Sequence, residues 1–506
     1  MSSNALSAYL NSVDQKELNS AFVAYLASLS SVAEVSPETA ADIVRELADQ
    51  RSNLKLIASE NYCSLATQLA MGNLLTDKYA EGYPHHRFYA GCDNVDNIEA
   101  RACEQACKLF GAEHAYVQPH SGADANLIAY WAILHTKVTT PALEEYKHKK
   151  LTDFNREEWI ELRHRLGNQR LFGQDYYSGG HLTHGYQYNV SAQMFDAHTY
   201  GVNKETDLLD YDEIETRALE IKPLILLAGY SAYSRKVNFK RMREIADKVG
   251  AVLMVDMAHF AGLVAGDVFK GDYDPILHAD VVTTTTHKTL RGPRGGLVLC
   301  KQEFAEQVDK GCPLVIGGPL PHVMAAKEIC LREANESEFK EYAKEIVVNA
   351  QALAEAFIDE DMEVLSGGTD NHLMLVNVTP FGLNGRQAES AIRECGITLN
   401  RNSLPYDSNG AWYTSGLRLG TPAITTLGMG KEEMKEIASV IKVILADTEP
   451  AVIQSGKNTG SLSKSKIRIT EEVRKGARDR VVALLKNYPV YPELDLPLLQ
   501  KFFLKD

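Results

Sequence analysis

Short apolar runs alternate with amphipathic helical patterns between about residues 110 and 300, and this alternation limits the possible folds more than any other feature. The run AVLMVD at 251–256 is continuous, as expected for a strand buried on both faces of a sheet. It follows a helical pattern at 240–249 that ends at Gly250. Similar runs occupy Pro223–Ala228, Ala279–Thr286 and Gly296–Cys300. Alternating strands and helices predict an α/β fold with a mainly parallel sheet.

The pattern of predicted helices and strands changes on both sides of this region. Residues 1–55 predict a helical arm, in which Ser36-Pro37-Glu38 is a typical helix start. We therefore divide the chain into this arm, a large domain at 56–334 and a smaller α+β domain at 335–506. Two segments are predicted to be insertions: a charged stretch at Lys137–Arg170 and a Gly/Ser/Lys-rich loop at 455–466.

Composition excludes several classes of protein. The 506 residues are 45% hydrophobic, which is too apolar for a wholly disordered chain. The net charge of −14 disfavours a nucleic-acid binder. No run reaches 18 apolar residues, so no membrane-spanning helix is expected, and the N-terminus lacks a secretory signal. The eight cysteines include no C-x-x-C pair, and we predict reduced thiols in a cytoplasmic protein and no metal site.

The string VVTTTTHKTLRGPRGG at 281–296 carries the strongest chemical signal. A β-branched strand delivers Lys288 to its carboxyl end, where ligands of parallel sheets bind. A lysine that is buried or flanked by cations loses its proton easily and forms a Schiff base with a carbonyl compound. The alternative is a surface lysine after an edge strand.

Asp256 ends the apolar strand at 251–256, so its carboxylate needs a cationic partner. The pyridinium nitrogen of pyridoxal phosphate (PLP) is such a partner, and an acid there keeps the ring protonated as an electron sink. The alternative is a structural salt bridge to Arg291 or Arg294.

The string QPHSGADAN at 118–126 precedes the helical pattern LIAYWAIL. A Ser-Gly turn that opens a helix presents free N–H groups and a hydroxyl, which suits a phosphate group. A capped helix with no ligand is the commoner interpretation of this string alone.

Together, Lys288 in TTTTHK, Asp256 in DMAH and His120-Ser121-Gly122 resemble the fold-type-I PLP enzymes, whose large domain is aspartate-aminotransferase-like. Longer motifs are similar to those of the serine hydroxymethyltransferase family. They are LIASENY (Leu56–Tyr62), DKYAEGYP (Asp77–Pro84), GGHLTHG (Gly179–Gly185), SAYS (Ser231–Ser234), GGTDNH (Gly367–His372) and TSGLRLGTPAIT (Thr414–Thr425). The motifs follow the family order over about residues 55–450.

The resemblance implies a role for each matching residue. Lys288 would hold PLP covalently, Asp256 would pair with its ring nitrogen, and His181 would stack on the ring. The remaining cofactor contacts would come from Ser121, Gly122, Ala123, Ser231 and His259, and from Gly317 and Gly318 of a neighbouring subunit. Ala123 stands where the family often has serine, so one hydroxyl contact is expected to be missing. We also expect Thr285, in the string TTTTHK, to be a catalytic residue.

The substrate contacts follow in the same way. Arg418 would clamp the substrate carboxylate, since its planar fork matches a carboxylate. Ser59 would assist it and Asn402 would contact the pterin of tetrahydrofolate. Glu81 would be the acid–base residue, and the further catalytic and site-lining residues would be Tyr79 and Tyr89. In the family, Tyr79, Glu81 and Tyr89 reach the neighbouring site, which implies a homodimer with shared active sites.

The implied reaction is the reversible conversion of L-serine and tetrahydrofolate to glycine and 5,10-methylenetetrahydrofolate, through an external aldimine of PLP. This is a transfer of one-carbon units, part of glycine biosynthesis. Phe88, Tyr176 and the loop at 312–318 depart from the family pattern and put folate affinity in question. The insertion at 137–170 is expected near the folate entrance.

Two other functions are alternatives to this reaction. The same site could racemise alanine or cleave 3-hydroxy amino acids without folate, because a carbanion at Cα has several fates. A PLP-fold protein kept as a binding module is disfavoured, because Lys288, Asp256 and Arg418 are all present.

Overall fold

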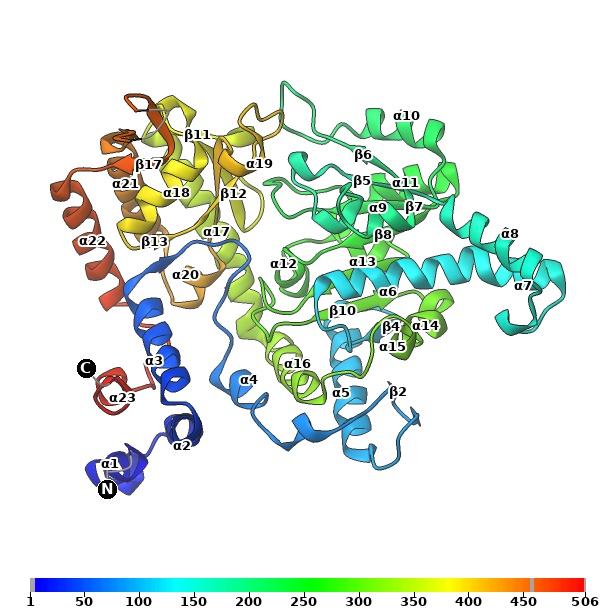
Figure 1. The fold of residues 1–506 in the computed structure, drawn as a ribbon, viewed down its shortest axis with the longest axis horizontal. Helices are drawn as coiled ribbons and strands as arrows, with labels where there is room; N and C mark the ends of the chain where they lie inside the picture. The colour runs from blue at the N-terminus through cyan, green and yellow to red at the C-terminus, as the bar shows by residue number, and fades with distance from the viewer. Residues whose placement is uncertain (1–4, 456–458, 505–506) are drawn as a thin grey trace.

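The computed structural model describes residues 5–455 and 459–504, and a seven-stranded sheet lies at the centre of the larger body (Figure 1). The strand order is β4-β10-β9-β8-β7-β5-β6. The strands are β4 (His114–Tyr116), β5 (Arg170–Gln174), β6 (Asp196–Tyr200), β7 (Ile225–Gly229), β8 (Val252–Asp256), β9 (Val281–Thr285) and β10 (Gly296–Cys300). Strands β6, β5, β7, β8 and β9 run parallel to one another. Strand β10 runs antiparallel to both of its neighbours, β9 and β4. The predicted mainly parallel sheet is confirmed.

Both faces of this sheet are covered by helices. Strands β7 to β10 are buried along their whole length, and alternate residues enter different apolar clusters. Leu226 and Leu253 pack with α5 (Asp93–Phe110), α11 (Phe239–Val249) and α16 (Pro321–Ala334). Leu227 and Met254 pack with α6 (Gly122–Leu134) and α14 (Gln302–Asp309) on the other face. Burial on two faces explains why these strands are continuous apolar runs.

A second, antiparallel sheet lies beside the first body, with strand order β11-β12-β15-β14 (Figure 1). Its strands are β11 (Glu363–Val364), β12 (Leu373–Asn377), β14 (Asn400–Asn402) and β15 (Gly416–Gly420). Helices α17 (Ser337–Asp359), α18 (Gly385–Glu394) and α21 (Lys431–Asp447) enclose its core. Helix α17 joins the two bodies, since Phe339 packs in the first core and Phe357 in the second. The division of the chain at residue 334 stays a prediction.

The two ends of the chain meet (Figure 1). Helices α1 (Ala5–Ser12), α2 (Ser20–Val35) and α3 (Pro37–Ser52) share an apolar cluster with α23 (Leu496–Phe503). Ser36 caps α3 by accepting the backbone N–H of Thr39 at 3.3 Å, as its sequence predicts. Among the described residues, no helix is both long and apolar enough to cross a membrane. All eight cysteines are free thiols.

The insertion at 137–170 does not border the ligand-binding edge of the sheet, so that expectation is wrong. The N-terminus of α6 faces the carboxyl ends of the strands, and its 13 residues carry the chain about 20 Å away. The insertion begins there and ends at Arg170, where parallel strand β5 starts. Helices α7 (Thr140–Tyr146) and α8 (Arg156–Gly167) project from this far edge (Figure 1).

The predicted loop at 455–466 is in part a strand. Strand β17 (Leu462–Arg468) pairs with β16 (Glu449–Val452). Ser463 is buried while Lys464 and Lys466 are exposed, which is strand-like alternation carried by residues that are uncommon in strands. Residues 456–458 of the predicted loop lie outside the described residues.

Candidate active site

Lys288 lies in the turn after the central strand β9, at the carboxyl end of the sheet, which excludes a surface lysine after an edge strand. Its backbone carbonyl accepts a hydrogen bond from Asn61 Nδ2 at 2.9 Å. Burial lowers the pKa of the Lys288 ammonium to about 8; the charge of Asp256 opposes this shift, and Arg418 and Arg294 add to it. About a tenth of this amine is therefore unprotonated at pH 7, far more than for an ordinary lysine.

Asp256 ends β8 with its carboxylate buried. The carboxylate accepts hydrogen bonds from Asn126 Nδ2 at 2.9 Å, His184 Nε2 at 3.1 Å and the backbone N–H of Ala258 at 3.0 Å. Burial alone would raise the pKa of Asp256, but His184, with His181 and Asn126, outweighs it and holds the pKa below its usual range. The carboxylate therefore stays ionised in the crevice.

The alternative of a salt bridge from Asp256 to arginine is wrong. Within the described residues Asp256 has no ion pair with Arg291 or Arg294. The Arg291 guanidinium lies 4.5 Å from the ring centroid of Tyr342 instead, and Arg294 is exposed. The carboxylate of Asp256 is thus held by hydrogen bonds and not by an arginine.

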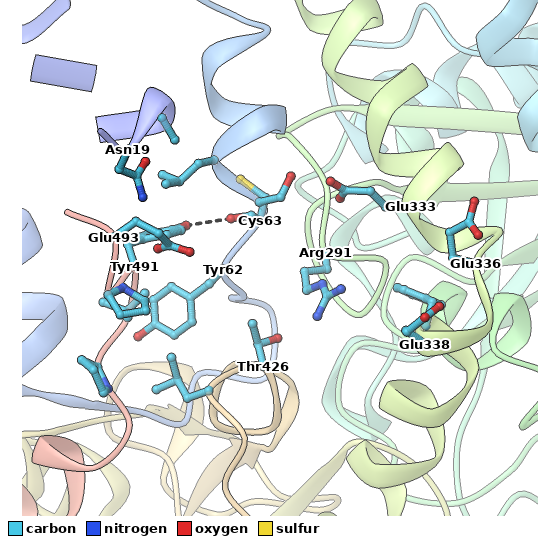
Figure 2. Close-up of a pocket in the computed structure, with 18 residues that line it drawn as sticks. Asn19, Tyr62, Cys63, Arg291, Glu333, Glu336, Glu338, Thr426, Tyr491 and Glu493 are labelled. Atoms are coloured by element: carbon cyan, nitrogen blue, oxygen red, sulfur yellow. Dashed lines mark hydrogen bonds between the residues drawn. The ribbon is translucent and has the colours of Figure 1, made fainter. Parts of the chain in front are cut away.

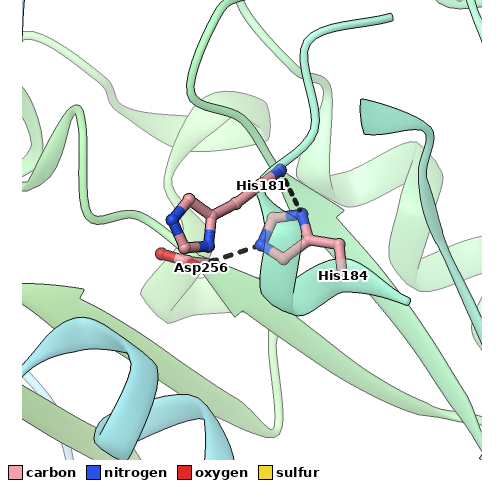
Figure 3. A group of neighbouring side chains, drawn as sticks. All are labelled: His181, His184 and Asp256. Atoms are coloured by element: carbon pink, nitrogen blue, oxygen red, sulfur yellow. Dashed lines mark hydrogen bonds and ion pairs between the residues drawn. The ribbon is translucent and has the colours of Figure 1, made fainter. Parts of the chain in front are cut away.

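His181 and His184 lie beside Asp256, and Figure 3 shows the three side chains together. His184 Nδ1 accepts the backbone N–H of His181 at 3.2 Å, so its Nε2 is the nitrogen that donates to Asp256. His181 Nδ1 lies 2.8 Å from Thr183 Oγ1. Burial lowers the pKa of His181 to about 4, with Asp256 opposing, so the ring is neutral near pH 7.

The same three residues are a possible metal ligand set. Their nearest ligand atoms all lie within 4.8 Å of one another. In this structure His184 and Asp256 are joined by a hydrogen bond, which already fixes both groups. The predicted absence of a metal stays a prediction.

The N-terminus of α6 forms a cradle at the same edge of the sheet. Ser121 caps the helix with its hydroxyl, and Gly122 and Ala123 are its first residues. A Cβ added at Gly122 would lie 2.7 Å from Thr285 Cγ2, so the helix start needs glycine there. The preceding His120 has a buried Nε2 without a hydrogen-bond partner among the described residues. Free helix N–H groups beside an unsatisfied imidazole nitrogen fit a phosphate group.

Arg418 enters the crevice from β15 of the second sheet. Its Nε donates to Asn400 Oδ1 at 3.0 Å, and its Nη1 donates to the carbonyl of Ser231 at 2.7 Å. It has no carboxylate partner in the described part of the chain. Burial lowers the pKa of Arg418 to about 10, while nearby Tyr176 opposes the shift. A half-buried, carboxylate-free guanidinium is suited to bind a ligand carboxylate.

Ser231 and His259 border the same crevice. His259 Nδ1 lies 3.2 Å from Nε2 of His372, and both rings are buried. Burial lowers the pKa of both histidines, so the pair is neutral near pH 7. The hydroxyl of Thr285 donates a hydrogen bond to the backbone carbonyl of Ala258 at 3.1 Å. The sequence prediction included His259 and Thr285 but missed His372.

Ser59 and Asn402 lie on segments that the fold places beside β15, the strand of Arg418. Asn402 is two residues from Asn400 on β14, so it points to the same face of the sheet. Ser59 follows Ala58, and a Cβ built on Gly420 at the end of β15 would lie 2.6 Å from Ala58 Cα.

Another predicted group lies apart from Lys288. Tyr79 Oη donates to Glu81 Oε1 at 3.3 Å, and its ring centroid lies 4.8 Å from that of Tyr89. A Cβ added at Gly318 would lie 3.5 Å from the Tyr79 ring, which brings the Gly317-Gly318 turn to the same place. Within residues 5–455 and 459–504, no hydrogen bond, ion pair or ring contact joins this group to Lys288. One chain therefore carries two separate parts of the predicted site.

A pocket of about 840 Å³ lies beside Arg291, three residues after Lys288 (Figure 2). Its lining includes Tyr62, Arg291, Thr426 and Tyr491. Thr426 Oγ1 donates to Asn61 Oδ1 at 2.7 Å, and Asn61 holds the carbonyl of Lys288. None of the predicted site residues lines this pocket, which is separate from the crevice.

Comparison with known proteins identifies close relatives. A family profile described as "Serine hydroxymethyltransferase" matches residues 32–153 and 165–441. A serine hydroxymethyltransferase of Treponema pallidum (strain Nichols) is 60% identical over 503 residues, covering 99% of this chain and 87% of that protein. One of Mycolicibacterium smegmatis is 55% identical over 482 residues, covering 94% of this chain and 96% of that protein. One of Chlamydia trachomatis serovar D is 51% identical over 496 residues, covering 98% and 99%.

Proposed function

The chain belongs to the serine hydroxymethyltransferase family, and from this premise we propose that the Lys288 crevice is its active site. The reaction is the reversible conversion of L-serine and tetrahydrofolate to glycine and 5,10-methylenetetrahydrofolate, with PLP as the cofactor. One observation carries the assignment: Lys288 and Asp256, from two neighbouring strand ends of the large sheet, and Arg418, from the middle of β15, converge on one crevice.

The crevice fits PLP. Lys288 would hold the cofactor covalently, Asp256 would bind its ring nitrogen, and the start of α6 with Ser121 and Gly122 would bind its phosphate. The unsatisfied Nε2 of His120 supports a ligand at this cradle. Bound PLP supplies an electron sink for the pair released when a bond to Cα breaks.

The protein side chains control protons and orientation. The pKa of about 8 leaves Lys288 able to give and take a proton at Nζ near neutral pH. Asp256 stays ionised because Asn126 and His184 donate to it, so it stabilises a cation in the crevice. His181 is neutral, so its ring packs against an aromatic ligand without adding charge.

Substrate recognition rests on Arg418. Two of its five N–H groups are used by Asn400 and by the Ser231 carbonyl, which leaves three for the carboxylate of serine or glycine. Ser59 would assist at this carboxylate, and Asn402 would meet the pterin of tetrahydrofolate.

We also propose a homodimer with shared active sites. Glu81, Tyr79 and Tyr89 would act in the site of the partner, because their own chain keeps them apart from Lys288. Around them Leu74 is 79% and Phe88 72% exposed, an apolar surface that a second copy of the chain would cover. Sedimentation should give the mass of two chains, and a monomer at working concentration would contradict the proposal.

We also propose a cytoplasmic location. The eight free cysteines are typical of a reducing compartment and support it.

The assay for the proposed site is formation of methylenetetrahydrofolate from serine. Lys288→Ala should abolish this activity, because Lys288 is the residue that would hold the cofactor covalently. The matched control is Lys301→Ala, which removes an ion pair with Asp280 at the other end of the sheet. Full activity of Lys288→Ala would refute the assignment.

A further inference from the structure

A buried polar cluster connects the phosphate cradle to the segment that carries Glu81. Gln118, three residues before Ser121, donates through Nε2 to the carbonyl of Gly82 at 2.8 Å and to Glu99 Oε1 at 2.7 Å. Gln118 and Glu99 are each only 1% exposed. One side chain therefore contacts both the residue next to Glu81 and helix α5.

The Glu81 end of this cluster is held at several points. Arg87 Nη1 donates to the carbonyls of Ala80 and Gly82, each at 3.0 Å. It therefore binds the backbone on both sides of Glu81. Arg87 Nη2 also pairs with Glu99. The hairpin of β2 (Gly82–Tyr83) and β3 (His86–Arg87) is thereby fixed to α5.

The cradle end is held by Lys327 of α16, a lysine that is 1% exposed. Its Nζ donates to the carbonyls of Val117 at 2.5 Å, Pro119 at 2.9 Å and Gly296 at 2.8 Å. Val117 and Pro119 flank Gln118, so Lys327 fixes the backbone from which the Gln118 side chain extends. Helices α5 and α16, which carry Glu99 and Lys327, pack side by side (Figure 1).

Stability alone does not account for this cluster. Burying charges costs desolvation, and well-packed apolar side chains usually stabilise a core as well or better. The cluster instead fixes one relative placement of two functional segments. We propose that Gln118, Glu99, Arg87 and Lys327 form a strut that couples the phosphate cradle of one subunit to the Glu81 segment serving the partner subunit. Cofactor binding in one site then orders a catalytic group of the other.

This inference rests on the proposed shared active sites, and mixed dimers separate the two ideas. A Lys288→Ala chain paired with a Glu81→Gln chain contains one site with both Lys288 and Glu81 intact. Recovery of activity in purified mixed dimers supports shared sites, and no recovery overturns them together with the strut.

The strut is tested by adding Gln118→Met to the Lys288→Ala chain. The competent site keeps its own phosphate cradle, yet it receives Glu81 from the altered chain. We expect kcat of that site to fall about tenfold, as for a misplaced catalytic group. The matched control is Gln387→Met on the same chain, which removes an equally buried amide that bonds the Ser463 carbonyl in the second body. An unchanged kcat with Gln118→Met overturns the strut while shared sites stand.

Tyr116→Phe provides a milder second variant in case Gln118→Met folds poorly. Tyr116 Oη donates to Gln118 Oε1 at 2.9 Å and so orients the amide. We expect a smaller loss of kcat in the same mixed dimer, and no loss overturns the role of the Gln118 amide.

Hydrogen exchange gives a readout that does not depend on activity. Adding PLP to the unaltered apoprotein should raise protection at residues 79–89 as well as at 119–124. In Gln118→Met the rise should persist at 119–124 and become smaller at 79–89, where only the contact with the partner's site remains. Equal rises in both proteins, or none at 79–89 in the unaltered protein, would contradict the coupling.

Discussion

Replacing Arg418 by lysine should weaken the binding of serine far more than the binding of folate. Two guanidinium N–H groups are committed to Asn400 and the Ser231 carbonyl, and three remain for the substrate carboxylate. Lysine keeps the charge but loses the planar fork, so we expect loss of one charge-assisted hydrogen bond, about 1.5–3 kcal/mol. This corresponds to a rise of about 10- to 150-fold in KM for serine.

The assay is steady-state formation of methylenetetrahydrofolate with serine and tetrahydrofolate varied separately. The KM for tetrahydrofolate should change little. Arg235→Lys is the matched control, because Arg235 also joins the two bodies, through Asp370 and Ser366, but lies outside the proposed site. A serine KM within about twofold of the unaltered enzyme would refute the assigned role of Arg418 and the magnitude derived for it.

Three further predictions test the surroundings of the site. The rate at which apoprotein takes up PLP should rise with pH through about 8, because burial lowers the pKa of Lys288 and uptake needs its neutral amine; a midpoint near 10.5 would contradict this. Gly122→Ala should weaken PLP binding by about 1–3 kcal/mol, because the new Cβ would lie 2.7 Å from Cγ2 of Thr285 on strand β9. The control Gly167→Ala, whose Cβ would have nothing within 4 Å, should bind PLP normally in the same titration. The double variant Lys149→Glu with Lys150→Glu should leave the folate KM unchanged, since both lie on the far-edge insertion; a raised KM would place that insertion near the folate site.

The sequence predicted the parts of the fold that depend on local pattern. The runs around Leu226, Leu253 and Val282 became buried central strands, since burial on both faces demands continuous apolar residues. The antiparallel direction of β10 was not predictable, because it depends on which way a five-residue strand is inserted into the sheet.

The same limit applies to the site. Lys288 and Asp256 were identified because each sits at the end of an apolar strand. Asn126, His184 and His372 were missed as site residues because their importance lies in contacts across 130, 72 and 113 residues, respectively. Only the folded chain brings such partners together, and these partners keep Asp256 ionised and hold His259 in place.

The central claim is that Lys288 holds the cofactor, and mapping the covalent site tests it most directly. The purified protein, reconstituted with PLP, should be yellow, and borohydride reduction followed by peptide mass spectrometry should find the adduct on Lys288 alone. The Lys288→Ala protein should yield no adduct after the same treatment. An adduct on another lysine, or a colourless protein that takes up no PLP, would contradict the account.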